Sequence, residues 1–248
     1  MGVISADAII LQTFAYGDTS RILRLLTRTH GLQSALARGA RGPKSRFGGV
    51  LEPFVEGVIT LNFREARDLQ TLNGFELRRA RQGLGRDLLR LGGASLLAEL
   101  VLRTGSEEPQ PALYDAVSDA LDELDAAPAA ELEHRTLALA WRLVAMLGFA
   151  PELDDCLACS RPLGPAEEAR FSYSAGGVLC PACAAAGGGA LLPPHARAAL
   201  RRFLEGGDAP LDRTLGHWRL LERYLDHHVL EGGVLRSFDF LARALAQS

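Results

Sequence analysis

The chain has 248 residues, of which 48% are hydrophobic and 23% charged, and its formal net charge is −3. This balance is typical of a folded globular protein and excludes an intrinsically disordered chain. No run of about 18 apolar residues predicts a membrane span, and Met1–Asp7 lacks the basic start and apolar middle of a secretion signal. We therefore expect a cytoplasmic protein without membrane contact.

The charge is distributed unevenly along the chain. Residues 1–80 carry 11 Arg and Lys against 7 Asp and Glu, residues 81–155 carry 6 against 14, and residues 156–248 carry 10 against 9. The N-terminal part is therefore basic and the middle part acidic. Such an asymmetry indicates that one end of the chain contacts nucleic acid.

The first 80 residues predict a β domain. We expect strands at residues 3–16, 20–27, 32–38, 54–63 and 69–72. In the fourth strand a two-residue period indicates one buried face, formed by Val55, Gly57, Ile59, Leu61 and Phe63. Five short strands with tight turns favour a small closed barrel of the OB type, and an SH3-like barrel is the alternative.

From Leu77 onward the hydrophobic period becomes helical. One helix contains Gly92–Gly93 as a weak point, a second is expected to start at Ser106–Pro109, and a third runs through residues 132–147. Further helices are expected from Pro193–Pro194, at residues 220–229 before Gly232–Gly233, and at residues 235–245. Residues 184–190, rich in Ala and Gly, are expected to form a flexible linker.

These elements predict an α+β fold in three parts. An N-terminal OB-type β-barrel at residues 1–80 precedes an α-helical domain at residues 81–155 and 190–248. A four-cysteine, zinc-ribbon-like module at residues 156–189 interrupts the helical domain.

All four cysteines occur as two Cys-x2-Cys pairs, Cys156 with Cys159 and Cys180 with Cys183, separated by twenty residues. Two residues between thiolates allow one tight turn to present both sulfurs to the same ion, and two such turns supply the tetrahedral set that zinc prefers. Because four thiolates leave no position for a water, we expect one structural Zn²⁺ and no catalytic metal.

Disulfides, a redox site and an iron–sulfur cluster are the alternatives to zinc for these cysteines. A cytoplasmic location disfavours disulfides, and a thioredoxin-like redox site requires only one such pair beside a strand–helix unit. Iron–sulfur clusters usually show other spacings, although this ligation stays open. Structural zinc is the interpretation that the spacing favours.

The most basic segment lies between Thr19 and Leu51, where no acidic residue occurs. Its cations alternate with glycines that allow close backbone approach, a composition suited to phosphate. An aromatic residue in the same segment could stack on an unpaired base. The predicted nucleic-acid-binding residues are Arg21, Arg24, Arg38, Arg41, Lys44, Arg46 and Phe47. The alternative is a solvated loop whose arginines pair with the acidic middle part.

Several motifs resemble those of the bacterial RecO family of recombination mediators. They are Tyr16-Gly17-Asp18 before Ser20-Arg21-Ile22-Leu23, Thr27-x2-His30-Gly31-Leu32, Gly39-Ala40-Arg41 leading into Lys44-Ser45-Arg46, Ala145-x-Leu147-Gly148-Phe149-x-Pro151, Tyr224-Leu225 and Arg236-Ser237. The resemblance follows nearly the whole chain in order, and residues 105–130 carry none of it.

The resemblance implies an OB fold, a helical domain and, in some members, a four-cysteine zinc module. It implies a non-enzymatic role in recombinational DNA repair at the nucleoid. Such proteins bind single- and double-stranded DNA, anneal complementary strands, and act with RecR, and in some bacteria RecF, to load RecA onto strands covered by single-strand-binding protein. They also recognise the acidic, apolar-tipped C-terminal tail of that binding protein.

We predict that this tail binds in the C-terminal helices, where basic and apolar side chains adjoin. The predicted groove consists of Arg197, Leu200, Arg201, Arg202 and Phe203. A different class of function is a zinc-ribbon adaptor that organises repair partners without touching DNA. The basic segment distinguishes the two, because an adaptor has no use for it. A nucleic-acid-modifying enzyme would require a clustered acidic or histidine site, and the sequence shows none.

Overall fold

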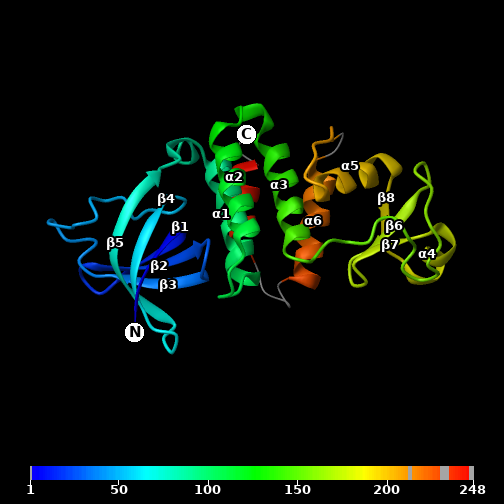
Figure 1. Ribbon diagram of the computed structural model, residues 1–248. Coiled ribbons are helices and arrows are strands. Elements are labelled where there is room, and N and C mark those ends of the chain that lie inside the picture. Colours follow the sequence, from blue (N-terminus) through cyan, green and yellow to red (C-terminus); the bar gives the residue numbers. More distant parts are fainter. Residues whose placement is uncertain (1, 212–213, 230–234, 246–248) are drawn as a thin grey trace. The chain divides into compact units, whose positions relative to one another are not determined.

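The computed structural model describes residues 2–211, 214–229 and 235–245, and the chain divides into two compact units, Met1–Ala127 and Pro128–Ser248 (Figure 1). The boundary between the units follows helix α2 (Pro111–Ala126). The predicted three-part domain division remains a prediction.

The first unit contains a closed five-stranded barrel. Its strands are β1 (Gly2–Tyr16), β2 (Ser20–Thr27), β3 (Gly31–Ala37), β4 (Glu56–Phe63) and β5 (Leu69–Arg79), in the order β1-β2-β3-β5-β4. Strand β1 pairs antiparallel with both β2 and β4, and β3 pairs parallel with β5. The strand order, closed by the β1–β4 pair and the parallel β3–β5 pair, confirms the predicted OB type over the SH3-like alternative. With the helices below, the barrel confirms the α+β fold class.

A β-bulge in β1 changes which of its side chains point into the barrel. The pairing with β2 shifts register between Ile10 and Gln12. Before the shift Ala6, Ala8 and Ile10 point into the barrel. After the shift the residue opposite core Leu23 is Thr13, so the inward positions change from even to odd. An extra residue in one strand has this effect because side chains alternate faces with a period of two.

The alternation predicted for the fourth strand is confirmed. Val55, Ile59 and Leu61 are buried in the barrel core, and Phe63 is half-buried. Position 57 requires glycine for a steric reason, since a Cβ there would lie 2.3 Å from the carbonyl oxygen of Glu76 in β5. The barrel core as a whole comprises Ala6, Ala8, Ile10, Leu23, Leu25, Ala35, Ala37, Phe47, Leu51, Val55, Ile59, Leu61 and Leu72.

The prediction that the helical period begins at Leu77 is wrong. Strand β5 continues to Arg79, because Leu77 still pairs with Gly57 of β4. The first helix, α1 (Leu88–Thr104), follows a short 3-10 turn at Gln82–Gly85, and the Asp87 side chain caps it by accepting a hydrogen bond from the Arg90 backbone N–H. Gly92 and Gly93 are buried inside a continuous helix.

The second helix starts later than predicted. Helix α2 begins at Pro111, and the expected start at Ser106–Pro109 is an extended connection. The backbone of this connection packs against the β2–β3 turn: Leu32 donates its N–H to Ser106 at 2.8 Å, and a Cβ on Gly31 would lie 2.4 Å from the Glu108 carbonyl oxygen. The Ser106 carbonyl, which would accept an intrahelical bond in a helix that starts there, is therefore committed to the barrel.

A buried arginine joins the barrel to α2 within the first unit. The Arg81 guanidinium donates to Glu56 at 2.5 Å, to Asp122 at 2.6 Å and to the Ser118 hydroxyl at 2.7 Å. It also donates to the Phe54 carbonyl at 3.0 Å. The Arg81 side chain is only 1% exposed, so these contacts hold a charge that water does not reach.

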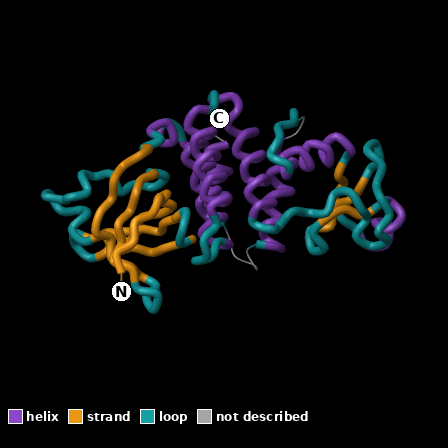
Figure 2. The backbone as a smooth tube through the Cα atoms, in the orientation of Figure 1, coloured by secondary structure: helices purple, strands orange, loops and turns teal. Residues whose placement is uncertain are grey.

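The second unit combines helices with a small sheet. The helices are α3 (Leu132–Met146), α4 (Pro181–Gly187), α5 (Pro194–Leu204), α6 (Thr214–His228) and α7 (Arg236–Leu245), and a 3-10 turn at Ala129–Glu131 precedes α3. The strands β6 (Ala169–Ser172), β7 (Gly177–Leu179) and β8 (Ala190–Leu192) form an antiparallel sheet in the order β7-β6-β8 (Figure 2).

The helices predicted around the cysteines are confirmed, and α5 starts at Pro194 as expected. The predicted helix end at Gly232–Gly233 lies outside the described residues. The predicted flexible linker at residues 184–190 is wrong: it is the second half of α4 and the first residue of β8, joined by Gly188 and Gly189 at positive φ. Among the described residues, no helix combines the length and the apolarity needed to cross a membrane.

Candidate metal centre and nucleic-acid interface

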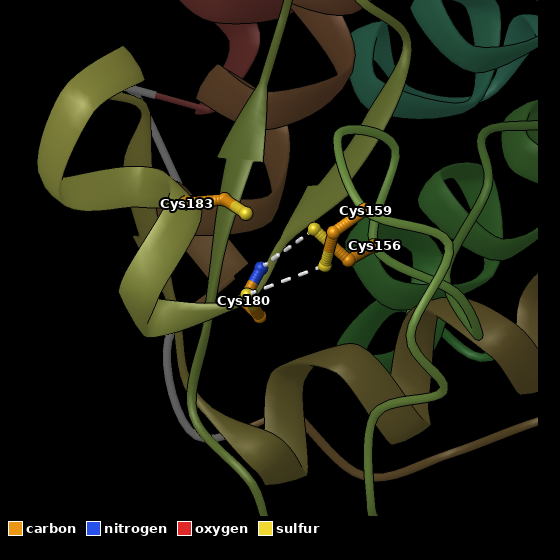
Figure 3. A group of neighbouring side chains, drawn as sticks. All are labelled: Cys156, Cys159, Cys180 and Cys183. Atoms are coloured by element: carbon orange, nitrogen blue, oxygen red, sulfur yellow. Dashed lines mark hydrogen bonds between the residues drawn. The ribbon is translucent and has the colours of Figure 1, made fainter.

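Two turns bring the four cysteines together. Cys156 and Cys159 lie in a knuckle that closes where Cys156 donates its N–H to the Arg161 carbonyl at 2.9 Å and Ser160 donates to the Cys156 carbonyl at 2.8 Å. Cys180 precedes α4, and Cys183 lies in its first turn. Figure 3 shows the sulfurs of both pairs converging. We call residues 152–192, which contain both turns and the strands β6–β8, the cysteine module.

The spacing of the sulfurs fits one tetrahedral ion. All four Sγ atoms lie within 4.8 Å of one another, and those of Cys159 and Cys180 are 4.0 Å apart (Figure 3). Zinc–sulfur bonds of about 2.3 Å in a tetrahedron place two sulfurs about 3.8 Å apart, so a small contraction completes the site. The described part of the chain contains no other such group of metal-ligating side chains.

The backbone favours thiolates in this cluster. Burial raises the pKa of Cys156, but the backbone N–H groups of Cys180, Ala158 and Cys159 outweigh it and lower that pKa to about 6. The Cys180 N–H donates to the Cys156 Sγ at 3.3 Å. The pKa of Cys183 rises to about 12, first because its thiol hydrogen-bonds to Cys180. Without a cation the crowded sulfurs cannot all ionise, whereas a bound divalent cation neutralises them.

Charged side chains outside the cluster brace the module. The Arg161 guanidinium binds Glu167, with 3.0 Å between Nη1 and Oε2, and the Glu167 carboxylate accepts the Gly164 N–H at 3.2 Å. Helix α5 contributes two arginines: Arg197 donates to the Gly164 carbonyl, and Arg201 pairs with Asp154. These contacts fix the loops that carry the first cysteine pair against α5.

The groove predicted on α5 does not exist. Leu200 and Phe203 are fully buried, Arg197 is 1% exposed, and Arg201 is engaged with Asp154. Only Arg202 of this set is exposed. The predicted tail-binding residues are therefore packing and bracing residues of the second unit, because the apolar face of α5 is turned into the core.

The basic segment is largely exposed on the barrel. Arg38, Arg41 and Lys44 are exposed and Arg24 is half-buried. Among the described residues, Arg24, Arg38 and Lys44 have no ion-pair partner. Arg21 differs, since it pairs with Glu52 and donates to the Leu51 carbonyl, both at 2.7 Å. The predicted phosphate-binding set thus contains three uncommitted cations. The alternative, pairing with the acidic middle part, holds for Arg28 of the same segment, which binds Asp115 through both guanidinium nitrogens at 2.7 and 2.9 Å.

The prediction that Phe47 stacks on an unpaired base is wrong. Its side chain is 6% exposed and belongs to the barrel core, so it cannot stack on a base. Arg46 covers it, with the guanidinium carbon 4.9 Å from the ring centroid and a hydrogen bond to the Leu72 carbonyl at 3.0 Å. The loop between β3 and β4, which extends from the barrel in Figure 2, turns this ring inward because burying an aromatic side chain is favourable.

The structure shows two candidate binding features that the sequence did not predict: a pair of exposed aromatic residues and a cavity. Phe14 and Tyr16 in β1 are 46% and 53% exposed, beside the basic segment. The sequence gives no signal for them, because Phe14 and Tyr16 continue the even-numbered apolar positions of Ala6, Ala8 and Ile10. A cavity of about 440 Å³ lies between β8, α5 and α6, and its lining includes Arg219 and Arg223 at helical i,i+4 spacing. No local motif marked that cavity.

The barrel with its uncommitted surface cations and the four clustered cysteines define the class: an OB-fold protein with a four-cysteine module arranged as in a metal-binding site. Two family models match this chain, Recombination protein O N terminal over residues 1–81 and Recombination protein O C terminal over residues 85–235. The chain therefore belongs to the RecO family and has a role in DNA repair.

Several relatives carry the name DNA repair protein RecO. The relative from Anaeromyxobacter sp. (strain Fw109-5) is 36% identical over 235 residues, which cover 91% of each chain. The relative from Myxococcus xanthus (strain DK1622) is 34% identical over 244 residues, covering 96% of each. The relative from Gloeobacter violaceus is 35% identical and covers 90% of this chain and 87% of its own.

Proposed function

We propose that this protein is a non-enzymatic recombination mediator that binds single- and double-stranded DNA and anneals complementary strands. With RecR, it helps to load RecA onto strands covered by single-strand-binding protein, and RecF is an indirect partner at the nucleoid. The observation that carries the proposal is the uncommitted cationic surface of the barrel, where Arg24, Arg38 and Lys44 have no ion-pair partner among the described residues.

Annealing has a simple physical requirement. Two phosphate backbones repel each other until cations neutralise them, and a cationic protein surface does this without reading bases. The barrel supplies that surface from a window without acidic residues. A family-wide role in DNA repair is consistent with such a surface.

The metal in this proposal is one structural Zn²⁺ held by Cys156, Cys159, Cys180 and Cys183. The donor set supports zinc, because four thiolates at this spacing match its preferred tetrahedron. Four protein ligands fill that tetrahedron, so the metal would fold the module and activate no water. The proposed function therefore includes no catalytic step.

The test is annealing of two complementary labelled oligonucleotides over a salt series, with no nucleotide present. We expect the wild-type protein to accelerate annealing and the acceleration to fade with salt. The double variant Arg38→Glu, Lys44→Glu should anneal more slowly, and its plot of log affinity for duplex DNA against log salt should be shallower by roughly 1.8, the share of two phosphate contacts.

A charge-matched control distinguishes the effect of this particular surface from the effect of the protein's net charge. Arg78→Glu, Arg86→Glu makes the same change of charge at exposed positions outside the basic segment. The control should anneal like the wild type. An unchanged salt slope in the Arg38, Lys44 variant would refute the assigned surface. No annealing at any salt by a zinc-loaded protein would favour the adaptor, which organises partners without touching DNA.

The tail of single-strand-binding protein requires a different site from the groove on α5. We assign it to the cavity of about 440 Å³ in the second unit. Leu191, Leu192 and Leu220 contribute apolar lining, and the exposed Arg219 and Arg223 stand at its rim. The Arg223 guanidinium carbon lies 5.5 Å from the centroid of the Tyr173 ring. An apolar cavity with a cationic rim is complementary to an acidic peptide with a hydrophobic end.

Charge reversal at this rim should weaken tail binding. We expect Arg219→Glu, Arg223→Glu to lower the affinity for a peptide of that sequence by about tenfold or more, since like charges would then face each other. Fluorescence anisotropy of a labelled peptide measures this. The matched control, Arg202→Glu, Arg243→Glu, changes two exposed arginines outside the cavity. Equal losses in both double variants would argue against the cavity.

A further inference from the structure

The outer face of the barrel carries an apolar strip next to the uncommitted cations. After the bulge in β1, Phe14 is directly opposite Ile22 of β2, and Ile22 is directly opposite Leu36 of β3. Residues opposite each other in neighbouring strands share a face. The inward residues here are Leu23 and Ala35, so Phe14, Ile22 and Leu36 form a row on the outside.

Tyr16 extends this row toward the β1–β2 turn. It lies two residues beyond Phe14, hence on the same face and about 6.8 Å farther along the strand. Phe14 is 46% exposed and Tyr16 is 53% exposed, which is unusual for two large aromatic side chains on one strand. We call Phe14, Tyr16, Ile22 and Leu36 the outer strip.

Cations flank the outer strip on two sides. The next row toward the bulge consists of Gln12, Arg24 and Ser34, and Arg24 has no ion-pair partner among the described residues. At the other end the basic loop folds back onto the β1–β2 turn: Arg41 donates its backbone N–H to Thr19 at 2.8 Å and its guanidinium to the Gly17 carbonyl at 3.3 Å. The outer strip therefore lies between Arg24 on one side and Arg41 on the other.

We propose that Phe14 and Tyr16 stack on unpaired bases and thereby give this protein a higher affinity for single-stranded than for duplex DNA. The proposal rests on the proposed DNA-binding function and deepens it. In a duplex both faces of every base except those at the ends are covered by neighbouring bases, so the interior of a duplex offers these rings no face on which to stack. The cations contact phosphates of either form. Aromatic stacking tolerates every base, which suits a protein that anneals strands of any sequence.

The test compares the affinities for a single-stranded oligonucleotide and for a blunt duplex of the same length. Each base–aromatic stack contributes enough that Phe14→Ala, Tyr16→Ala should lower single-strand affinity by about 30-fold or more. Duplex affinity should change by less than about twofold, and the salt slope should be unchanged, because the variant removes no charge. Tyr16→Phe should retain wild-type affinity, since stacking does not need the hydroxyl.

The control variant Val3→Ala, Leu77→Ala truncates two exposed apolar side chains of the same barrel outside the outer strip, 67% and 44% exposed. It should bind both DNA forms like the wild type. Unchanged single-strand affinity in the Phe14, Tyr16 variant, or equal losses for single strands and duplex, would overturn the inference and leave an outer strip that docks a protein. A wild-type protein that binds no DNA at any salt would overturn the proposed function as well.

Discussion

Removal of the metal should release one zinc ion per chain and unfold the cysteine module while the barrel stays folded. Structural zinc sites of this kind contribute about 10–16 kcal/mol of apparent binding free energy. The module has only three short strands and a seven-residue helix, too little to hold four crowded thiols together. The cation is therefore expected to supply most of its folding free energy.

The variant Cys180→Ser, which removes one ligand, is likewise expected to lack bound zinc and to have an unfolded cysteine module. Zinc analysis gives the stoichiometry, and hydrogen exchange followed peptide by peptide shows which residues lose protection. Ser174→Ala, an exposed change in the same module, is the control and should keep both zinc and protection. A stoichiometry other than one, or full protection of residues 152–192 in Cys180→Ser, would contradict the prediction. Visible absorbance would indicate iron–sulfur ligation, since Zn²⁺ has a filled d shell.

Replacement of Arg81 by Met should lower the free energy of unfolding of the first unit by about 3–5 kcal/mol. The loss arises because the Glu56 carboxylate, with a side chain 15% exposed, would lose its closer cation and keep only Arg79, whose Nη1 lies 3.9 Å from Oε2 of Glu56. Hydrogen exchange of β4 and α2 in the full chain measures the change. Arg78→Met, an exposed neighbour with a side chain 58% exposed, should cost little. A loss below about 1 kcal/mol would contradict the prediction, because it would show that the ion pairs of Arg81 barely offset the desolvation penalty of the buried charges.

This network also predicts a pH dependence. Burial raises the pKa of Glu56, but the hydrogen bonds from Ser118 and Arg81 outweigh it and hold the pKa below 4.5. A carboxylate with a depressed pKa stabilises the fold above its unfolded pKa, and this stability is lost as the pH falls through the folded value. The difference between wild type and Arg81→Met should accordingly shrink in acid, where a protonated Glu56 no longer needs a cation.

Local patterns in the sequence were sufficient for most elements of the barrel and for the cysteine cluster. The strand boundaries of the barrel follow from alternation and turn residues, and four of the five agree with the structure to within two residues. The cysteine cluster follows from two spacings, because a Cys-x2-Cys turn presents its sulfurs to one ion wherever it folds. The basic segment needed only the absence of acids between Thr19 and Leu51.

Side-chain direction was decided by the tertiary structure. Phe47 and Phe14 look equally available in the sequence, yet one closes the barrel core and the other is 46% exposed. The bulge at Ile10–Gln12 reverses the faces of β1, and no local residue signals it. Likewise the arginines of α5 resemble a peptide-binding rim in the sequence. In the structure Arg197 and Arg201 instead bind Gly164 and Asp154 of the cysteine module. Local patterns determine which residues form an element, whereas the partners that bury one face and leave another open come from distant parts of the chain.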